Sequence, residues 1–383
     1  MEAMESLLAH LRTRLDKLRK LRKEGAKIIG YTPGGFIPDE LVEACGAILM
    51  PVGVIRGGDH EPVTAAEAYL PRFLDTFCRA QIGYRALGEE PLYQMIDLFV
   101  VPVTSANIRT ISDTWEIYTD VEVFRFGVPK KKSDRGFKYY LEGLNLLKER
   151  LEKLTGTKIR DEKLRQAIDL SNKMRRLLKE ISLMRKSPCP PISGRDFILL
   201  NHASYLADKA TLIEVLESLC RELRQKEKGE PKTPRILLTG STLAMGDYMI
   251  FNLVEETGAE IVIEEFGEGI RHYWEMVQPD GDLMESLADR YYRRRVPPAF
   301  FRPSRDRLDL IVKLAKDFNV DGVVWYQLMY NESYDMESYY FPQILEKEMG
   351  IPMLKIESDY DTSEVLSFRT RVETFIEIIR GRK

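Results

Sequence analysis

Cysteines are the residues of this chain that could most readily hold a metal or act as nucleophiles. The four lie far apart, and no pair has the CxxC spacing of a zinc or redox motif, so no local site of that kind is expected. They are Cys45, Cys78, Cys189 and Cys220. Cys78 lies on an expected helix, in LPRFLDTFCRAQIG, where a lone cysteine is more often a small core residue than a ligand.

Two glycine-containing loops follow strand-like segments. In GSTLAMGD (240–247), backbone N–H groups could receive a phosphate or carboxylate at a helix start, although Gly246-Asp247 could simply begin that helix. In EEFGEGIRHY (264–273), Gly267 permits close approach of a ligand, and Arg271 could grip an anionic group. The alternative for the second loop is a solvated connection.

Two charged segments complete the candidates. RYYRRRVPPAFFRPSRDR (290–307) is an arginine cluster that could be a solvated helix face, a docking surface, or a grip on the phosphates of coenzyme A. IESDYD (356–361) could bind Mg²⁺ through Glu357, Asp359 and Asp361. Capping of the final helix by Asp361 is the simpler role for this segment.

Composition excludes several classes of protein. The 383 residues hold 57 Lys and Arg against 60 Asp and Glu, which leaves no basic footprint for nucleic acid as the main partner. The 44% hydrophobic content argues against a disordered chain. No apolar run reaches the roughly 18 residues of a membrane span, and residues 1–24 lack the apolar core of a signal peptide. We therefore expect a cytoplasmic protein with reduced thiols and no membrane partner.

The elements that must position these candidates alternate between strands and helices in both halves of the chain. Strands are expected at 27–32, 47–53, 97–104, 121–129, 235–241, 260–266, 321–327 and 352–358. Helices are expected near 106–118, 246–257, 283–294, 305–318, 335–349 and 364–382. The alternation predicts an α/β fold with two doubly wound, Rossmann-like parallel-sheet domains. The predicted organisation is an N-terminal helix (1–25), a first α/β domain (26–132), a helical region with a linker (133–230) and a second α/β domain (231–383). In such sheets ligands bind beyond the carboxyl ends of the strands.

Several segments together resemble the 2-hydroxyacyl-CoA dehydratase family, which includes benzoyl-CoA reductase subunits. They include GYTPGGFIPDELVEACGAILMPVG, LPRFLDTFCRAQIG, DLFVVPVTSANIRTISDTW, LLTGSTLAMGDYMIFNLVEETGAEIVIEEFGEGIRHYW and the ending from DGVVWYQLMYNESYD onward, in the order of the family, over roughly 26–382. The resemblance implies a heterodimer with a related subunit, a [4Fe–4S] cluster held by three cysteines, an ATP-hydrolysing activator that delivers an electron, and an acyl-CoA substrate. Such enzymes of anaerobic metabolism are lyases that remove water from a 2-hydroxyacyl-CoA, or reductases that dearomatise a ring.

The sequence departs from the family at two of the three positions where the resemblance implies a cluster ligand. Cys78 stands at the first position, Ser105 at the second, and Tyr330-Asn331 at the third. Fe–S clusters are normally held by thiolates, which Ser and Asn do not supply. Cys45 and Cys189 lie near expected strand ends and could in principle supply cluster ligands at a shifted position.

Two hypotheses of different class follow. In the first, the chain is a dehydratase or reductase subunit without a standard cluster of its own, which helps to form the acyl-CoA pocket and the subunit interface while a partner carries the cluster. Ser105, Tyr330 and Asn331 would be its catalytic residues, with a hydroxyl on the thioester carbonyl. The substrate-binding set would be Gly34, Gly35, Gly240, Ser241, Gly267 and Arg271, and the metal position Cys78. In the second, the scaffold is a regulatory protein that binds a small anion. A third reading is an altered cluster on Cys78 and non-thiolate ligands.

Overall fold

The computed structural model describes residues 1–32, 34–53, 55–226, 233–299 and 301–382. It contains two four-stranded sheets, and every strand pair in both sheets is parallel. The strands are β1 (Ile28–Tyr31), β2 (Ile48–Pro51), β3 (Leu98–Val103), β4 (Glu122–Gly127), β5 (Arg235–Gly240), β6 (Glu260–Glu265), β7 (Gly322–Leu328) and β8 (Met353–Ser358). The predicted α/β class with two Rossmann-like sheets is confirmed.

The two sheets have the same topology. Their strand orders are β2-β1-β3-β4 and β6-β5-β7-β8. The inner strands β5 and β7 are buried along their whole length, as continuous apolar runs predict for strands covered on both faces. In each sheet the chain first adds a strand on one side of the first inner strand and then crosses to the other side. Open parallel sheets bind ligands at this switch point, between the two inner strands.

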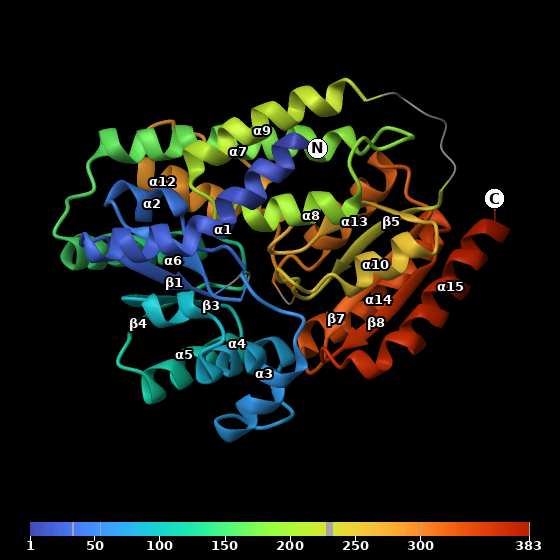
Figure 1. The fold of residues 1–383 in the computed structure, drawn as a ribbon, viewed down its shortest axis with the longest axis horizontal. Coiled ribbons are helices and arrows are strands. Elements are labelled where there is room, and N and C mark those ends of the chain that lie inside the picture. The colour runs from blue at the N-terminus through green and yellow to red at the C-terminus, as the bar shows by residue number, and fades with distance from the viewer. Residues whose placement is uncertain (33, 54, 227–232, 300, 383) are drawn as a thin grey trace.

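Helices cover both sheets (Figure 1). Those of the first half and the helical region are α1 (Glu2–Lys23), α2 (Asp39–Ala44), α3 (His60–Ala65), α4 (Thr76–Leu87), α5 (Ala106–Tyr118), α6 (Asp134–Thr155), α7 (Asp161–Met184), α8 (Gly194–Ala203) and α9 (Lys209–Arg224). Those of the second half are α10 (Met249–Glu256), α11 (Ile270–Tyr273), α12 (Leu283–Ala288), α13 (Arg305–Asp317), α14 (Glu332–Met349) and α15 (Val365–Gly381). Figure 1 shows α7, α8 and α9 along one side of the molecule, spanning both sheets. None of the described helices combines the length and apolarity that a bilayer crossing requires.

Two expected helices differ in detail. The helix expected from 246 begins at Met249, so Gly246-Asp247 precede it rather than start it. The helix expected at 283–294 is α12, which continues as a π-helical turn over Asp289–Arg294. Beyond that turn, Phe301 stacks on Phe36 with ring centroids 5.9 Å apart, so this part of the second half reaches the loop after β1.

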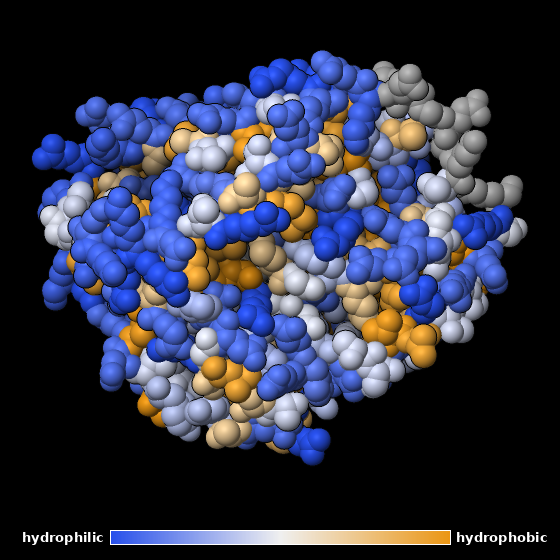
Figure 2. Space-filling model, in the orientation of Figure 1, coloured by the Kyte–Doolittle hydropathy of each residue, from blue (hydrophilic) through white to orange (hydrophobic). Residues whose placement is uncertain are grey.

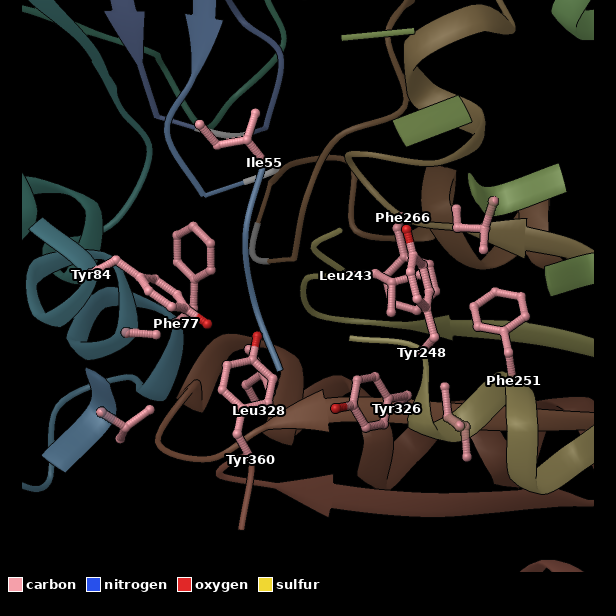
Figure 3. Close-up of a cluster of buried hydrophobic side chains, with 14 of the residues drawn as sticks. Ile55, Phe77, Tyr84, Leu243, Tyr248, Phe251, Phe266, Tyr326, Leu328 and Tyr360 are labelled. Carbon is pink, nitrogen blue, oxygen red and sulfur yellow. The ribbon is translucent and has the colours of Figure 1, made fainter. Parts of the chain in front are cut away.

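One hydrophobic core runs through both halves. Figure 3 shows Phe77 and Tyr84 from the first half facing Tyr326 and Tyr360 from the second, and all four are buried in a single cluster. The backbone also joins the halves, because Gly57 N donates to Met245 O at 2.8 Å. The outer surface is mainly hydrophilic with separate apolar patches, as Figure 2 shows for one face. The carboxyl ends of the two sheets are therefore held together by packing.

Candidate functional site

A small cavity lies where the carboxyl ends of the two sheets meet. Loops after β1, β3, β5, β6 and β7 contribute to its lining, together with the start of α4 and the segment before Phe301. Seven of the predicted site residues line it: Gly34, Cys78, Ser105, Ser241, Gly267, Arg271 and Asn331. They come from both halves of the chain, so the cavity occupies the position that the two switch points predict.

The other three predicted residues do not line this cavity. Gly35 has φ +67°, and a Cβ there would collide with the Arg295 guanidinium. Gly240 has φ +147°, and a Cβ there would collide with the Tyr326 carbonyl of β7. Tyr330, with φ +63°, is 44% exposed. The two glycines thus permit close packing beside the site.

Cys78 and Asn331 are tied together by Asp75. Asp75 caps α4 by accepting from Cys78 N at 3.1 Å, and its other carboxyl oxygen accepts from Asn331 Nδ2 at 2.6 Å. Burial raises the pKa of Asp75 to about 7, against these two hydrogen bonds, which lower it. Burial, with Asp75 beside it, also raises the pKa of the Cys78 thiol well above its ordinary value. The unit joins the first half to the loop after β7.

The donor set around Cys78 does not fit a three-cysteine [4Fe–4S] cluster. Cys78 is the one cysteine in the cavity lining within the described ranges, and its raised pKa favours the thiol over the thiolate that a cluster needs. The Cys45 thiol donates to Val42 O at 3.0 Å, and Cys189 is exposed. Among described residues no group of three His, Cys, Asp or Glu could hold a metal. The residues around Cys78 therefore do not support a reaction step on a [4Fe–4S] cluster in this chain.

Arg271 is held by a buried ionic network. Its Nε donates to Glu265 at 2.7 Å, and Arg307 Nε donates to the other oxygen of Glu265 at 3.0 Å. Burial alone would raise the pKa of Glu265, but the two guanidinium groups outweigh burial and lower it. Because Glu265 already neutralises Arg271, this arginine gives the cavity less positive charge than the sequence suggests.

The arginine cluster divides between interior and surface. Arg290 donates to the carbonyls of Glu275 and His272 at 2.9 and 2.8 Å, and the buried Arg295 donates to the carbonyls of Arg271 and Gly34. Arg293 and Arg305 form ion pairs near the surface. The buried members therefore fasten backbone loops around the cavity.

The other candidate segments have structural partners. Asp247 is buried and accepts from Tyr326 Oη at 2.9 Å, and Ser241 Oγ accepts from Leu328 N at 3.0 Å. Asp361 caps the short 3-10 turn Thr362–Glu364 by accepting from Ser363 N at 2.8 Å, rather than the final helix α15 as predicted, which begins after that turn without a side-chain cap. The sequence patterns at these two strand ends therefore include residues that stabilise the loops.

Glu268 lies in the loop 266–271, which the sequence predicts to line the pocket, but the sequence assigned this residue no role of its own. It lines the cavity, yet only 3% of it is exposed, and burial raises the pKa of its carboxyl group. An acid between two glycines after a strand end is the available signal, but charge in a glycine-containing loop is more often solvated. The helical region fixes its backbone, since Asn201 of α8 donates to its backbone carbonyl.

Comparison with known proteins gives a consistent result over nearly the whole chain. The family model described as "2-hydroxyglutaryl-CoA dehydratase, D-component" matches residues 35–379. The chain is 29% identical over 363 residues to YjiM, a provisionally named dehydratase subunit of Escherichia coli, covering 94% of this chain and 93% of that protein. It is 25% identical to the (R)-phenyllactyl-CoA dehydratase beta subunit of Clostridium sporogenes, covering 94% of each chain. It is 23% identical to one of the benzoyl-CoA reductase subunits of Thauera aromatica, covering 92% of this chain and 91% of that protein.

Proposed function

Because the chain belongs to the family of the 2-hydroxyglutaryl-CoA dehydratase D-component, we propose that it is the beta-type subunit of an acyl-CoA dehydratase or benzoyl-CoA-reductase-like complex. Its own task is to bind the acyl end of a coenzyme A thioester and to contact an alpha-type partner. The partner carries the [4Fe–4S] cluster, and an ATP-hydrolysing activator reduces it. The proposal includes a cytoplasmic location, which suits four free cysteines.

The observation that carries this proposal is the convergence of Cys78, Ser105 and Asn331 on one cavity. These are the positions at which the family resemblance implies cluster ligands, and they retain one thiol beside a hydroxyl and an amide. The chain thus keeps a cavity at these positions, but its side chains differ from the three cysteines that the family resemblance implies. A hydroxyl and amides suit the oxygens of an acyl thioester better than they suit iron.

Ser105 is suited to bind the thioester carbonyl. Its Oγ accepts from Ile108 N at 3.2 Å as the cap of α5, which leaves the hydroxyl proton free to donate. A donor fixed at a helix start needs little rearrangement when charge grows on the carbonyl oxygen. Asn331 is positioned by Asp75, so its amide is less free than the Ser105 hydroxyl.

The test is co-purification of the chain from its native source without oxygen, with iron and acid-labile sulfide measured on each separated subunit. We expect a related partner chain with about four irons, as a [4Fe–4S] cluster requires, and none in this chain. Four irons in this chain, lost on Cys78→Ala, would establish the altered-cluster reading instead. A lone chain or homo-oligomer that binds a small anion but no acyl-CoA would point to the regulatory reading.

A further inference from the structure

Glu268 lies in the loop after β6, and its backbone is held by hydrogen bonds. Asn201 of α8 donates to its carbonyl, and Gly269 N donates to Phe266 O at 3.2 Å. The residue is buried and lines the cavity on the side contributed by the second sheet. Ser105 lies in the same lining but comes from the first sheet. A ligand in the cavity would therefore meet Ser105 and Glu268 from different halves of the protein.

The two oxygens of the Glu268 carboxyl group have different surroundings. The backbone N–H groups of Glu268 and Leu243 act on the carboxyl as hydrogen-bond donors. Oε2, in contrast, is buried and has no hydrogen-bond partner among the described residues. A neutral carboxyl group fits this arrangement, with the carbonyl oxygen on the amide side and the proton on Oε2.

The nearby cations do not pair with Glu268. Arg271 pairs with Glu265, and Arg295 donates to backbone carbonyls. None of the ion pairs among the described residues includes Glu268. Tyr31 and Tyr205 lie close enough to Glu268 to interact with it electrostatically. Burial raises the pKa of both tyrosines, so they stay neutral and add no charge. A buried donor without a partner normally has one in the working state.

We propose that Glu268 is a specificity-determining residue whose protonated carboxyl group donates a hydrogen bond to the 2-hydroxyl oxygen of the bound acyl thioester. This inference rests on the proposed function. Ser105 takes the thioester carbonyl, so the second oxygen of a 2-hydroxyacyl group needs a second donor. Glu268, which follows a strand of the other sheet, supplies that donor.

The test compares two probes that differ by one hydroxyl group, lactoyl-CoA and propanoyl-CoA, by isothermal titration into the protein as isolated with any partner that accompanies it. We expect the wild type to prefer lactoyl-CoA by about 5- to 10-fold, the usual worth of one hydrogen bond. Glu268→Ala removes that preference and leaves propanoyl-CoA binding within about 2-fold of wild type. Glu268→Gln, which keeps an N–H donor, retains most of the preference.

A pH series and a control variant separate this role from a structural one. The wild-type preference falls as pH rises through the raised pKa of Glu268, while that of Glu268→Gln stays flat. Glu260→Gln is the matched control, because Glu260 lies at the other end of β6 and its pKa is also raised, to about 7. The preference of Glu260→Gln for lactoyl-CoA over propanoyl-CoA should equal that of the wild type at every pH.

Two results overturn the inference while leaving the proposed function standing. One is a preference for lactoyl-CoA that survives Glu268→Ala. The other is equal weakening of both probes in that variant, which would place Glu268 on the carbonyl or on the pocket wall. Failure of the wild type to bind either probe, in contrast, overturns the proposed function and this inference with it. If Glu268→Ala does not fold, the Gln variant and the wild-type pH series decide.

Discussion

Asp75 has a protonation state that matters for the stability of the cavity. Its carboxyl group is buried, and burial raises the folded-state pKa to about 7 from an ordinary value of 3.8. The folded protein therefore holds this proton at pH values where the unfolded chain has released it. The stabilisation is present below about pH 4 and is lost as the pH rises to about 7, at a slope of at most about 1.4 kcal/mol per pH unit.

The first prediction is that Asp75→Asn flattens this part of the stability curve. Asn is a good N-cap and keeps an acceptor for Cys78 N, so the helix start should survive. Urea denaturation between pH 4 and 7 measures the effect. Asp208→Asn is the control, because Asp208 also caps a helix, but its pKa is lowered, so its contribution is lost as pH falls. An unchanged slope in Asp75→Asn would contradict the assignment.

The second prediction concerns the two roles of Ser105. Ser105→Ala removes the cap of α5 and should cost about 1 kcal/mol of folding free energy, and it should also weaken acyl-CoA binding about 5- to 10-fold through the lost hydroxyl. Ser133→Ala removes a cap of the same kind from α6, with Oγ 3.1 Å from Gly136 N, and lies outside the cavity lining. Equal binding by both variants would show that Ser105 is only a cap.

At the scale of elements, Gly240 lies at the switch point of the second sheet, where the backbone of β7 leaves no room for a side chain. With φ +147° and the Tyr326 carbonyl where a Cβ would lie, no other residue fits at the end of β5. We expect Gly240→Ala to destabilise the protein by roughly 2–4 kcal/mol, through both strain and collision. Gly156→Ala, at φ +71° with open space around it, should cost about 1 kcal/mol. Thermal unfolding of both variants checks this order, and a reversed order would contradict it.

The strands were predictable because their signal is local. Each predicted run agrees with the observed strand to within about two residues, since buried parallel strands are continuous apolar segments such as GVVWYQ in β7. Helix starts were harder, because α10 has no capping side chain and begins after Asp247, which turns inward to Tyr326 instead. A local pattern does not contain that long-range hydrogen bond.

At the scale of the whole molecule, the sequence predicts where the site lies. It predicts only partly which side chains in the site are charged and how they are paired. Strand ends brought Gly34, Ser105 and Asn331 to one cavity because parallel strands share their carboxyl edge. The state of a charged residue depends on partners far along the chain. Glu265 neutralises Arg271, and Asn201 donates to the Glu268 backbone carbonyl, neither of which a single loop sequence reveals. The domain boundaries remain a prediction.

The helical region is locked to the first sheet by a buried ion pair. Arg175 of α7 donates to Glu40 of α2 at 2.6 Å, and Tyr291 bonds to both side chains, at 2.8 and 2.9 Å. Burial would raise the pKa of Glu40, but the surrounding cations Arg175, Arg290 and Lys209 together lower it. Both charged side chains are almost fully buried, so removing one leaves the other without its opposite charge.

We therefore expect Arg175→Met to cost about 3–5 kcal/mol in urea denaturation, and Glu40→Gln combined with Arg175→Met to cost less than Arg175→Met alone. The double variant is more stable because it removes the buried charge as well as its partner. Arg224→Met, which breaks the exposed pair with Glu180, should cost at most about 1 kcal/mol. Additive losses in the double variant would mean that Glu40 does not depend on Arg175. The helical region would then depend on its other ties, such as the Lys209–Glu43 and Arg185–Glu264 pairs.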